Sequence, residues 1–522
     1  MSSGYQLVLG TSVGEQIVRE RRLWRLAYVS MLGLGALLAL LAWRRGPGTL
    51  SLALAVLIFL LGAWATRPLL ALNMTLLFTL VGDSVTAPWY PMVKNFSSHE
   101  SILFVANALT ISPIDVTLGF ALACLLLQRI ASQVPLVKGP LYRPLMVFTG
   151  FVMFGALYGT ARGGDTRVAV FEVRPFFYLA IFYLLASNYC RTATHFRRLL
   201  WTAMGAVLLN SLLSLNFYFQ LNHDSKASLE SLGEHGAAVG MNTLFVLLIG
   251  SCLFRGSSAR SRWVLLIMAL PVGWVYVLSN RRAAVVGLLA GIAFLAVIVF
   301  WRQPRTFFKF VPVLGVLVLA YLGAFWNSTS AAGFPAQAVK SVISPNTLSK
   351  RDLSSDLYRQ IENNDLNFTI RQTKAFGVGF GNTFYQPFKL PDLGTTFAFR
   401  NYIPHNSVLW IWLQTGFLGF VSMLYLLGRG LMVGASKLRL VRDGPNVVVL
   451  STAAIFIAMY SVFAYVDIAW DARNMLMLGV ALAVCANFPV PARAPTSVAQ
   501  AEDGTSFEPP SLVPADGGVT GS

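Results

Sequence analysis

Residues 283–301 read AAVVGLLAGIAFLAVIVFW, an unbroken apolar run bounded by Arg281-Arg282 on one side and Arg302 on the other. About 20 apolar residues in a helix are long enough to cross a hydrocarbon core of roughly 30 Å. Similar runs recur along most of the chain, in which 56% of the 522 residues are hydrophobic and only 12% are charged. A soluble protein of this length needs more charge to coat its surface. The sequence therefore predicts an all-α polytopic membrane protein.

The spans on either side of this run predict a bundle of about 12 to 14 transmembrane helices. Pro113 interrupts one span, so that region could instead hold a re-entrant or broken helix. The first run lacks a small-residue cleavage site and is interpreted as a retained anchor. We expect spans at 24–43, 50–66, 69–82, 102–127, 144–161, 174–190, 198–220, 237–254, 263–279, 283–301, 309–326, 405–428, 446–466 and 474–488.

The remaining stretches divide the chain into parts. A cytoplasmic N-terminal segment (1–23) precedes a transmembrane bundle (24–326). A large periplasmic loop (327–404) then leads to the C-terminal transmembrane helices (405–488). This loop is too long for a simple connection, and we expect short helices within it. Residues 489–522 are rich in Pro, Ala, Gly and Ser, which is typical of a disordered tail, here expected in the cytoplasm.

The formal charge of +18 comes mainly from short basic clusters between the apolar runs. Arginine and lysine are enriched in cytoplasmic loops, so these clusters indicate the cytoplasmic face of an inner membrane rather than a nucleic-acid partner. The long loop then lies on the outer, periplasmic face. Arginines at 44–45, 162–174 and 281–282 run against this bias. An arginine on the outer face needs another reason to be there.

Arg281 and Arg282 are the most informative of these exceptions, because almost no loop separates the two apolar runs that flank them. Guanidinium groups bind phosphate oxygens in a two-pronged way. Arg174 also lies at the outer mouth of an expected span. Snorkelling to lipid phosphate explains any one of these arginines. Three of them on one face favour a phosphate-bearing ligand.

His405 opens a span on the same face, in the sequence Pro404-His405-Asn406-Ser407. The positive end of the helix dipole favours a neutral imidazole, and a neutral imidazole can accept a proton from a hydroxyl. On position alone, an interfacial histidine bonded to lipid headgroups explains the residue equally well.

Other polar residues on this side carry weaker signals. Arg359 and Glu362 would share one face of a helix, where a surface ion pair is the preferred interpretation. The alternating glycines of 376–382 let the backbone either approach a ligand or pack tightly in a turn. Asp115 lies inside an apolar stretch and is expected to pair with a basic residue. The four cysteines have neither a disulfide framework nor zinc-site spacing.

These segments, in this order, resemble the O-antigen ligase/polymerase superfamily of the Wzy and WaaL type, which includes exopolysaccharide polymerases. Residues 279–284 (SNRRAA) are similar to its Ser-x-x-Arg-Gly/Ala segment. Residues 377–382 (GVGFGN) are similar to the Gly-x-Gly segment that ends its long loop. His405-Asn406-Ser407 and residues 413–419 (LQTGFLG) are similar to its His-Asn-x-x-Leu and Thr/Ser-Gly-x-x-Gly segments. The resemblance is best over residues 237–430.

The resemblance implies an enzyme that acts on glycans carried by undecaprenyl pyrophosphate at the periplasmic face. It implies transfer of the glycan to a sugar hydroxyl without a metal ion or another cofactor. Arg282 would bind the pyrophosphate, and His405 would orient or activate the acceptor hydroxyl. A fixed guanidinium stabilises the charge that the departing pyrophosphate gains in the transition state. Further candidate substrate-binding residues are Arg281, Arg174, Arg359 and Arg371.

Polymerisation of repeat units and ligation of a finished glycan to lipid A-core share this motif set. We favour polymerisation, with ligation as the alternative. The expected partners are the lipid-linked glycan, an acceptor glycan or lipid A-core, membrane lipids, a flippase and a chain-length regulator. A transporter of lipid-linked sugars would place polar residues in the mid-membrane and is ranked lower. A metal-dependent membrane glycosyltransferase is disfavoured, because the first outer loop, residues 44–48, has no carboxylate.

Overall fold

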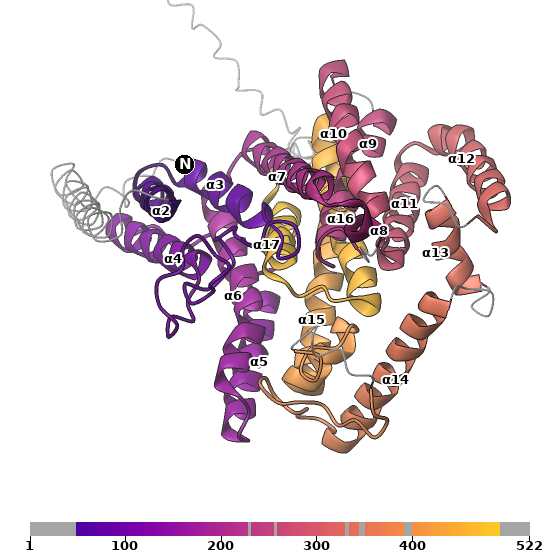
Figure 1. Cartoon of the computed structure of the whole chain (residues 1–522). Helices are drawn as coiled ribbons and strands as arrows, with labels where there is room; N and C mark the ends of the chain where they lie inside the picture. The colour runs from indigo at the N-terminus through magenta and orange to yellow at the C-terminus, as the bar shows by residue number, and fades with distance from the viewer. Residues whose placement is uncertain are drawn as a thin grey trace, which may run out of the picture. The chain divides into compact units, whose positions relative to one another are not determined.

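A computed structural model of the chain describes residues 49–227, 231–254, 258–328, 333–343, 350–390 and 399–490. The anchor expected at 24–43, the N-terminal segment and the tail beyond residue 490 lie outside the described residues. Within the described ranges the regular structure is helical, with no β-strand. The helices (Figure 1) are α2 (Thr49–Thr66), α3 (Pro68–Leu80), α4 (Pro113–Ser132), α5 (Tyr142–Ala161), α6 (Thr166–Tyr189), α7 (Ala193–Gln220), α8 (His223–Ala227), α9 (Ala237–Leu253), α10 (Ala259–Leu278), α11 (Arg282–Arg302), α12 (Pro304–Phe325), α13 (Phe334–Ile343), α14 (Lys350–Thr373), α15 (Ser407–Leu440), α16 (Gly444–Val466) and α17 (Ala472–Asn487).

Nine of the described helices are long and apolar enough to cross a membrane: α4, α5, α6, α7, α10, α11, α12, α15 and α16. Four shorter apolar helices accompany them, in α2, α3, α9 and α17. The all-α polytopic architecture is therefore confirmed. The outer loop expected at 327–404 contains α13 and α14, and α14, with 24 residues, is longer than the short helices expected there.

Helix α16 lies at the centre of the bundle and packs against α9, α11, α15 and α17 (Figure 1). Its apolar window is 89% buried, whereas α12 at the edge of the bundle has no buried residue. The sequence of α16 suits this position, because it contains no charged residue and its serine hydroxyls bond within the helix. The hydroxyl of Ser451, for example, donates to the carbonyl of Val448 in the preceding turn (3.1 Å). Such a side chain can be buried without losing its hydrogen bond.

Helix α4 begins later than the span expected at 102–127, because the stretch before Pro113 forms turns instead of helix. Proline fits the first turn of a helix, where its missing N–H has no partner to lose. Ser112 and Asp115 form a capping box at this end, in which the backbone N–H of Ser112 donates to Asp115 (2.7 Å). Asp115 also pairs with Arg174 (3.4 Å), so the basic partner expected for this carboxylate is present.

Basic side chains at one end of the bundle cap the carboxyl ends of neighbouring helices. The guanidinium of Arg302 donates to the carbonyl of Val441, just past α15 (2.7 Å). The ammonium of Lys437 donates to two carbonyls at the end of α17 (2.6 and 3.0 Å). Cations are favourable there, because the last carbonyls of a helix are unpaired and carry partial negative charge. This end carries the basic loops expected in the cytoplasm, and the loops expected on the outer face meet at the other end.

Candidate functional site

His405 lies one residue before Asn406, the N-cap of α15, and faces a carboxylate from α14. Its backbone N–H donates to Oε2 of Glu362 (2.9 Å), and its Nδ1 lies 3.2 Å from the same oxygen. The Glu362 side chain is only 2% exposed. A buried carboxylate at Nδ1 favours the tautomer with the proton on that nitrogen. The Nε2 atom of His405 is then the atom that can accept a proton.

The position of Glu362 differs from the one expected from the sequence. A surface ion pair between Arg359 and Glu362 is wrong, because Glu362 is buried against His405. Arg359 instead points its guanidinium toward Asp467, with 4.0 Å between the nearest atoms. Helix α14 packs against α15, so one face of α14 is covered and its polar residues have interior partners. On this face the ring of Tyr358 lies edge-on to His405, and burial raises the pKa of Tyr358 to about 12.

The two adjacent arginines at the start of α11 face different partners. Arg282 makes a two-pronged pair with Asp356 of α14, with N–O distances of 2.7 and 2.9 Å. Arg281 points inward, where it donates to the carbonyl of Gly233 (3.0 Å) and lies 2.7 Å from Nδ1 of His235. Arg282 is thus paired with a carboxylate that is 37% exposed, whereas Arg281 is part of the interior.

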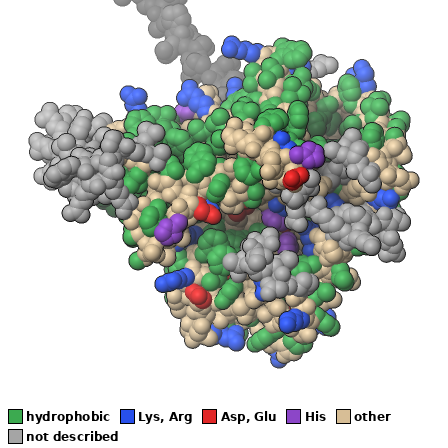
Figure 2. Space-filling model, in the orientation of Figure 1, with side chains coloured by type: hydrophobic (Ala, Val, Ile, Leu, Met, Phe, Trp, Pro, Cys, Tyr) green, Lys and Arg blue, Asp and Glu red, His purple; other side chains and the backbone are tan. Residues whose placement is uncertain are grey.

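A second histidine, His235, lies beside His405, although the sequence pattern does not single it out. Its Nδ1 lies 2.7 Å from Oδ1 of Asp467, whose side chain is 1% exposed. The centroids of the two imidazole rings are 5.9 Å apart. Figure 2 shows histidine side chains beside basic ones in a hollow near the middle of the drawn face. The signal that could have found Asp467 is a carboxylate in a short loop between two apolar runs.

Two of the expected substrate-binding residues have no contact with this group. Arg174 lies inside α6, not at its mouth, and its guanidinium pairs with Asp115, donates to Asn95 (2.7 Å) and contacts the carbonyl of Thr110. Arg371 is exposed near the end of α14 and makes no polar contact within the described part of the chain. Their roles in substrate binding stay predictions.

The glycine run at 376–382 packs against other helices. Gly377, Gly379 and Gly381 all have positive φ (72°, 81° and 81°), a region that suits glycine. A Cβ at Gly379 would lie 2.5 Å from the backbone of Gly159 in α5. The N–H of Gly381 donates to the buried carboxylate of Glu172 in α6 (2.7 Å). Of the two interpretations that the sequence left open, the structure shows tight packing, which fixes the chain between α14 and α15.

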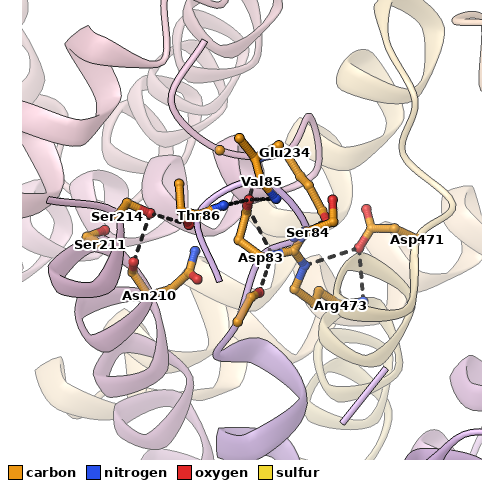
Figure 3. Close-up of polar contacts among 12 residues, drawn as sticks. Asp83, Ser84, Val85, Thr86, Asn210, Ser211, Ser214, Glu234, Asp471 and Arg473 are labelled. Atoms are coloured by element: carbon orange, nitrogen blue, oxygen red, sulfur yellow. Dashed lines mark hydrogen bonds and ion pairs between the residues drawn. The ribbon is translucent and has the colours of Figure 1, made fainter. Parts of the chain in front are cut away.

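A second charged cluster lies close by and holds loops together (Figure 3). Arg473, in the first turn of α17, donates to the carbonyl of Gly82 (2.7 Å), pairs with Glu234 and lies 3.5 Å from Asp83. The Asp83 side chain is fully buried and also accepts the N–H of Glu234 (2.7 Å). The cluster therefore joins the loop after α3, the loop before α9 and the start of α17.

Comparison with known proteins identifies the segment that carries this site. A family model described as O-antigen ligase matches residues 264–424, which include Arg282, Glu362 and His405. No curated protein matches the chain. Members of this family are glycosyltransferase-like ligases and polymerases, and the family suggests lipid-linked glycans and membrane lipids as the molecules that the chain meets. Residues 264–424 of this multi-pass membrane protein therefore match the O-antigen ligase family model, and the match supports the O-antigen ligase/polymerase superfamily.

Proposed function

We propose that the chain polymerises glycan repeat units carried by undecaprenyl pyrophosphate, at the periplasmic face of the bacterial inner membrane. The observation that carries the proposal is the His405–Glu362 pair beside Arg359 and the adjacent Arg281 and Arg282. A base next to several guanidiniums is the set of groups that glycosyl transfer from a pyrophosphate needs.

In the proposed reaction, Nε2 of His405 accepts the proton of the acceptor hydroxyl. The hydroxyl oxygen forms a bond to the anomeric carbon of the donor glycan. The bond between that carbon and the pyrophosphate oxygen breaks, and the pyrophosphate leaves with the electron pair. Glu362 keeps the proton on Nδ1 and stabilises the imidazolium that forms, as buried carboxylates do for catalytic histidines. The proton then passes from His405 to solvent or to the departing phosphate.

Arg282 is the proposed ligand of the pyrophosphate. Its pair with Asp356 already uses both prongs of the guanidinium, the geometry in which arginine also binds phosphate. In the bound state the pyrophosphate takes the place of Asp356. Arg359 supplies a second positive charge from α14, and Arg281 adds to the local potential from the interior. Arg371, roughly 14 Å further along α14 than Glu362 at 1.5 Å per residue, suits contact with the glycan.

The same geometry serves a ligase that transfers a finished glycan to lipid A-core. The observation that favours this second candidate is the description of the matching family model, O-antigen ligase. A strain that lacks the gene separates the two. Loss of long chains with single repeat units still attached supports the polymerase, whereas loss of all attached glycan supports the ligase.

The direct test uses the purified full chain and the lipid-linked repeat unit extracted from the deletion strain. The proposal predicts longer glycans on a gel and release of the polyprenyl pyrophosphate, with and without a chelator. If the wild-type protein forms no longer glycan and transfers none to lipid A-core, the proposed function is wrong. A loss of product only when the chelator is present would contradict metal independence alone.

A further inference from the structure

The site contains two histidine–carboxylate pairs, of which the proposed reaction uses one. His405 faces Glu362, and His235 faces Asp467. The two rings lie edge to face, with centroids 5.9 Å apart and an angle of 66° between their planes, so both can face the same bound molecule. The side chains of His235 and His405 are 34% and 19% exposed, so each can be reached from outside.

The position of Asp467 is closely determined by its surroundings. Its Oδ1 also accepts the N–H of Ile468 (2.8 Å), and its carbonyl accepts the hydroxyl of Ser407 at the start of α15 (3.1 Å). Burial alone would raise the pKa of Asp467, but its interaction with His235 and then the charge of Arg359 outweigh burial and hold the pKa well below its usual range. Each donor that faces a buried carboxylate offsets part of the cost of burying its charge, so a proton on the nearby nitrogen of His235 is favoured over a lone pair there.

The tautomer of His235 follows from this preference. Its Nδ1 lies 2.7 Å both from Asp467 and from a guanidinium nitrogen of Arg281, and it can make only one of these hydrogen bonds at a time. The buried carboxylate is the stronger partner, so Nδ1 carries the proton and Nε2 has a lone pair. Burial lowers the pKa of His235 more than Asp467 raises it, and the charges of Arg281 and His405 lower it further. The ring is therefore neutral at pH 7.

Both Nε2 atoms are acceptors without a hydrogen-bonding partner among the described residues, in contrast to both Nδ1 atoms. We propose that His235 is a second substrate-contacting residue, whose Nε2 accepts a hydrogen bond from a hydroxyl of the acceptor sugar next to the hydroxyl that His405 activates. Asp467 is its positioning residue. This inference rests on the proposed glycan transfer. It gives His235 a role in selecting the acceptor sugar and no role in binding the pyrophosphate.

A pair of amide substitutions separates the two nitrogens of the ring. In His235→Asn, the amide can still donate to Asp467 from near the Nδ1 position, but nothing replaces Nε2. In His235→Gln, the longer side chain places its amide near the Nε2 position. His223→Asn is the matched control, because the His223 side chain is exposed and, among the residues that the structure describes, its one ion-pair contact is with Asp224, at 3.9 Å.

The assay uses purified full chain, a lipid-linked repeat unit as donor and an alkyl glycoside of the same repeat unit as acceptor, which lacks pyrophosphate and cannot donate. We expect His235→Asn to lower kcat/KM for the acceptor by about tenfold to a hundredfold, mainly through KM, as expected for one lost hydrogen bond in a closed site. His235→Gln should recover part of this loss. Binding of farnesyl pyrophosphate, a short donor mimic, and the melting temperature should stay at wild-type values, as should every property of His223→Asn.

Several outcomes would overturn the inference. One is wild-type acceptor kinetics in His235→Asn. Another is weakened farnesyl pyrophosphate binding in that variant. The third is loss of the folded protein in both amide variants, which would mean that His235 has a structural role. These outcomes are distinct from failure of the proposed function, which shows as absence of transfer by the wild-type protein itself.

Discussion

The two charged clusters at one end of the bundle both pair basic side chains with buried carboxylates, yet they differ in how many of their donors and acceptors have partners. Around Arg473, the guanidinium has protein partners on several sides, and its side chain is 9% exposed. Around His405 and His235, each ring has one satisfied nitrogen and one that faces no described partner. A cluster whose donors and acceptors are all paired stabilises the fold, whereas a cluster with spare acceptors is prepared for a ligand.

The largest expected effect is on catalysis. His405→Ala should lower glycan transfer by about 10²–10⁴-fold, the usual contribution of a general base. The melting temperature should fall less than in Arg473→Ala, because the backbone N–H of residue 405 still donates to the buried Glu362 (2.9 Å) and Asn406 still caps the helix. Transfer rates and thermal unfolding of the purified variant are the measurements. Wild-type transfer by His405→Ala would remove the main contrast between the two clusters.

The corresponding change in the other cluster should affect stability. Arg473→Ala leaves the fully buried Asp83 without its cation, and such a loss costs about 3–5 kcal/mol. We expect a lower melting temperature and less protein in the membrane. Arg167→Ala, at an exposed arginine in the first turn of α6, is the control and should match the wild type. If Arg473→Ala unfolds like the wild type, the cluster in Figure 3 does not hold the loops together.

Arg282 tests whether an arginine of the site can be removed without harm to the fold. Its partner Asp356 is 37% exposed, so the pair should contribute no more than about 1 kcal/mol to stability. Arg282→Ala should nevertheless lower transfer by about 10²–10³-fold, because one fixed donor to the leaving group is lost. Transfer, farnesyl pyrophosphate binding and melting temperature are measured together. Arg260→Ala, at an exposed position on the opposite end of the bundle, should change none of them.

Asp356 should have a smaller effect of opposite sign. Asp356→Asn removes the charge that competes with phosphate for Arg282, so farnesyl pyrophosphate should bind about twofold to fivefold more tightly. Isothermal titration in detergent measures this difference. Weaker binding in Asp356→Asn would mean that the carboxylate orients the guanidinium more than it blocks it.

The smallest expected effect concerns pH. Burial raises the pKa of Asp471, at the N-cap of α17, to about 6. The folded state therefore binds this proton more tightly than the unfolded state, and this group lowers stability as pH rises from about 4 to 6. Asp471→Asn can still cap the helix and lacks this titration. The melting temperature of the variant relative to the wild type should rise over that interval, and an interval without change would contradict the assignment.

Much of this arrangement could be predicted from the sequence. The apolar runs gave most spans to within a few residues, because length and composition decide a transmembrane helix. The sequence placed Arg282 and His405 at the same end of the bundle, and the structure has both beside α14. That this end faces the periplasm stays a prediction. The glycines of 376–382 predict a special backbone conformation, although only the structure decides between packing and ligand approach.

The partners of these residues could not be predicted. Glu362 lies 43 residues from His405, and Asp467 lies 232 residues from His235. Such pairs depend on how α14 and the loop after α16 pack, which leaves no periodic signal in a single sequence. The start of α4 was missed for a local reason, since apolar turns before Pro113 have the composition of a span.

The loop before α9 connects the two clusters by a single peptide bond, because Glu234 pairs with Arg473 and His235 with Asp467. Adjacent Cα atoms are about 3.8 Å apart, so neither side chain can shift far without its neighbour. In a chimera of two related chains, exchange of residues 231–236 alone would therefore disturb both clusters. They should be transplanted together with 82–86 and 467–473, as one three-loop module, so that acceptor preference is carried over without loss of the protein.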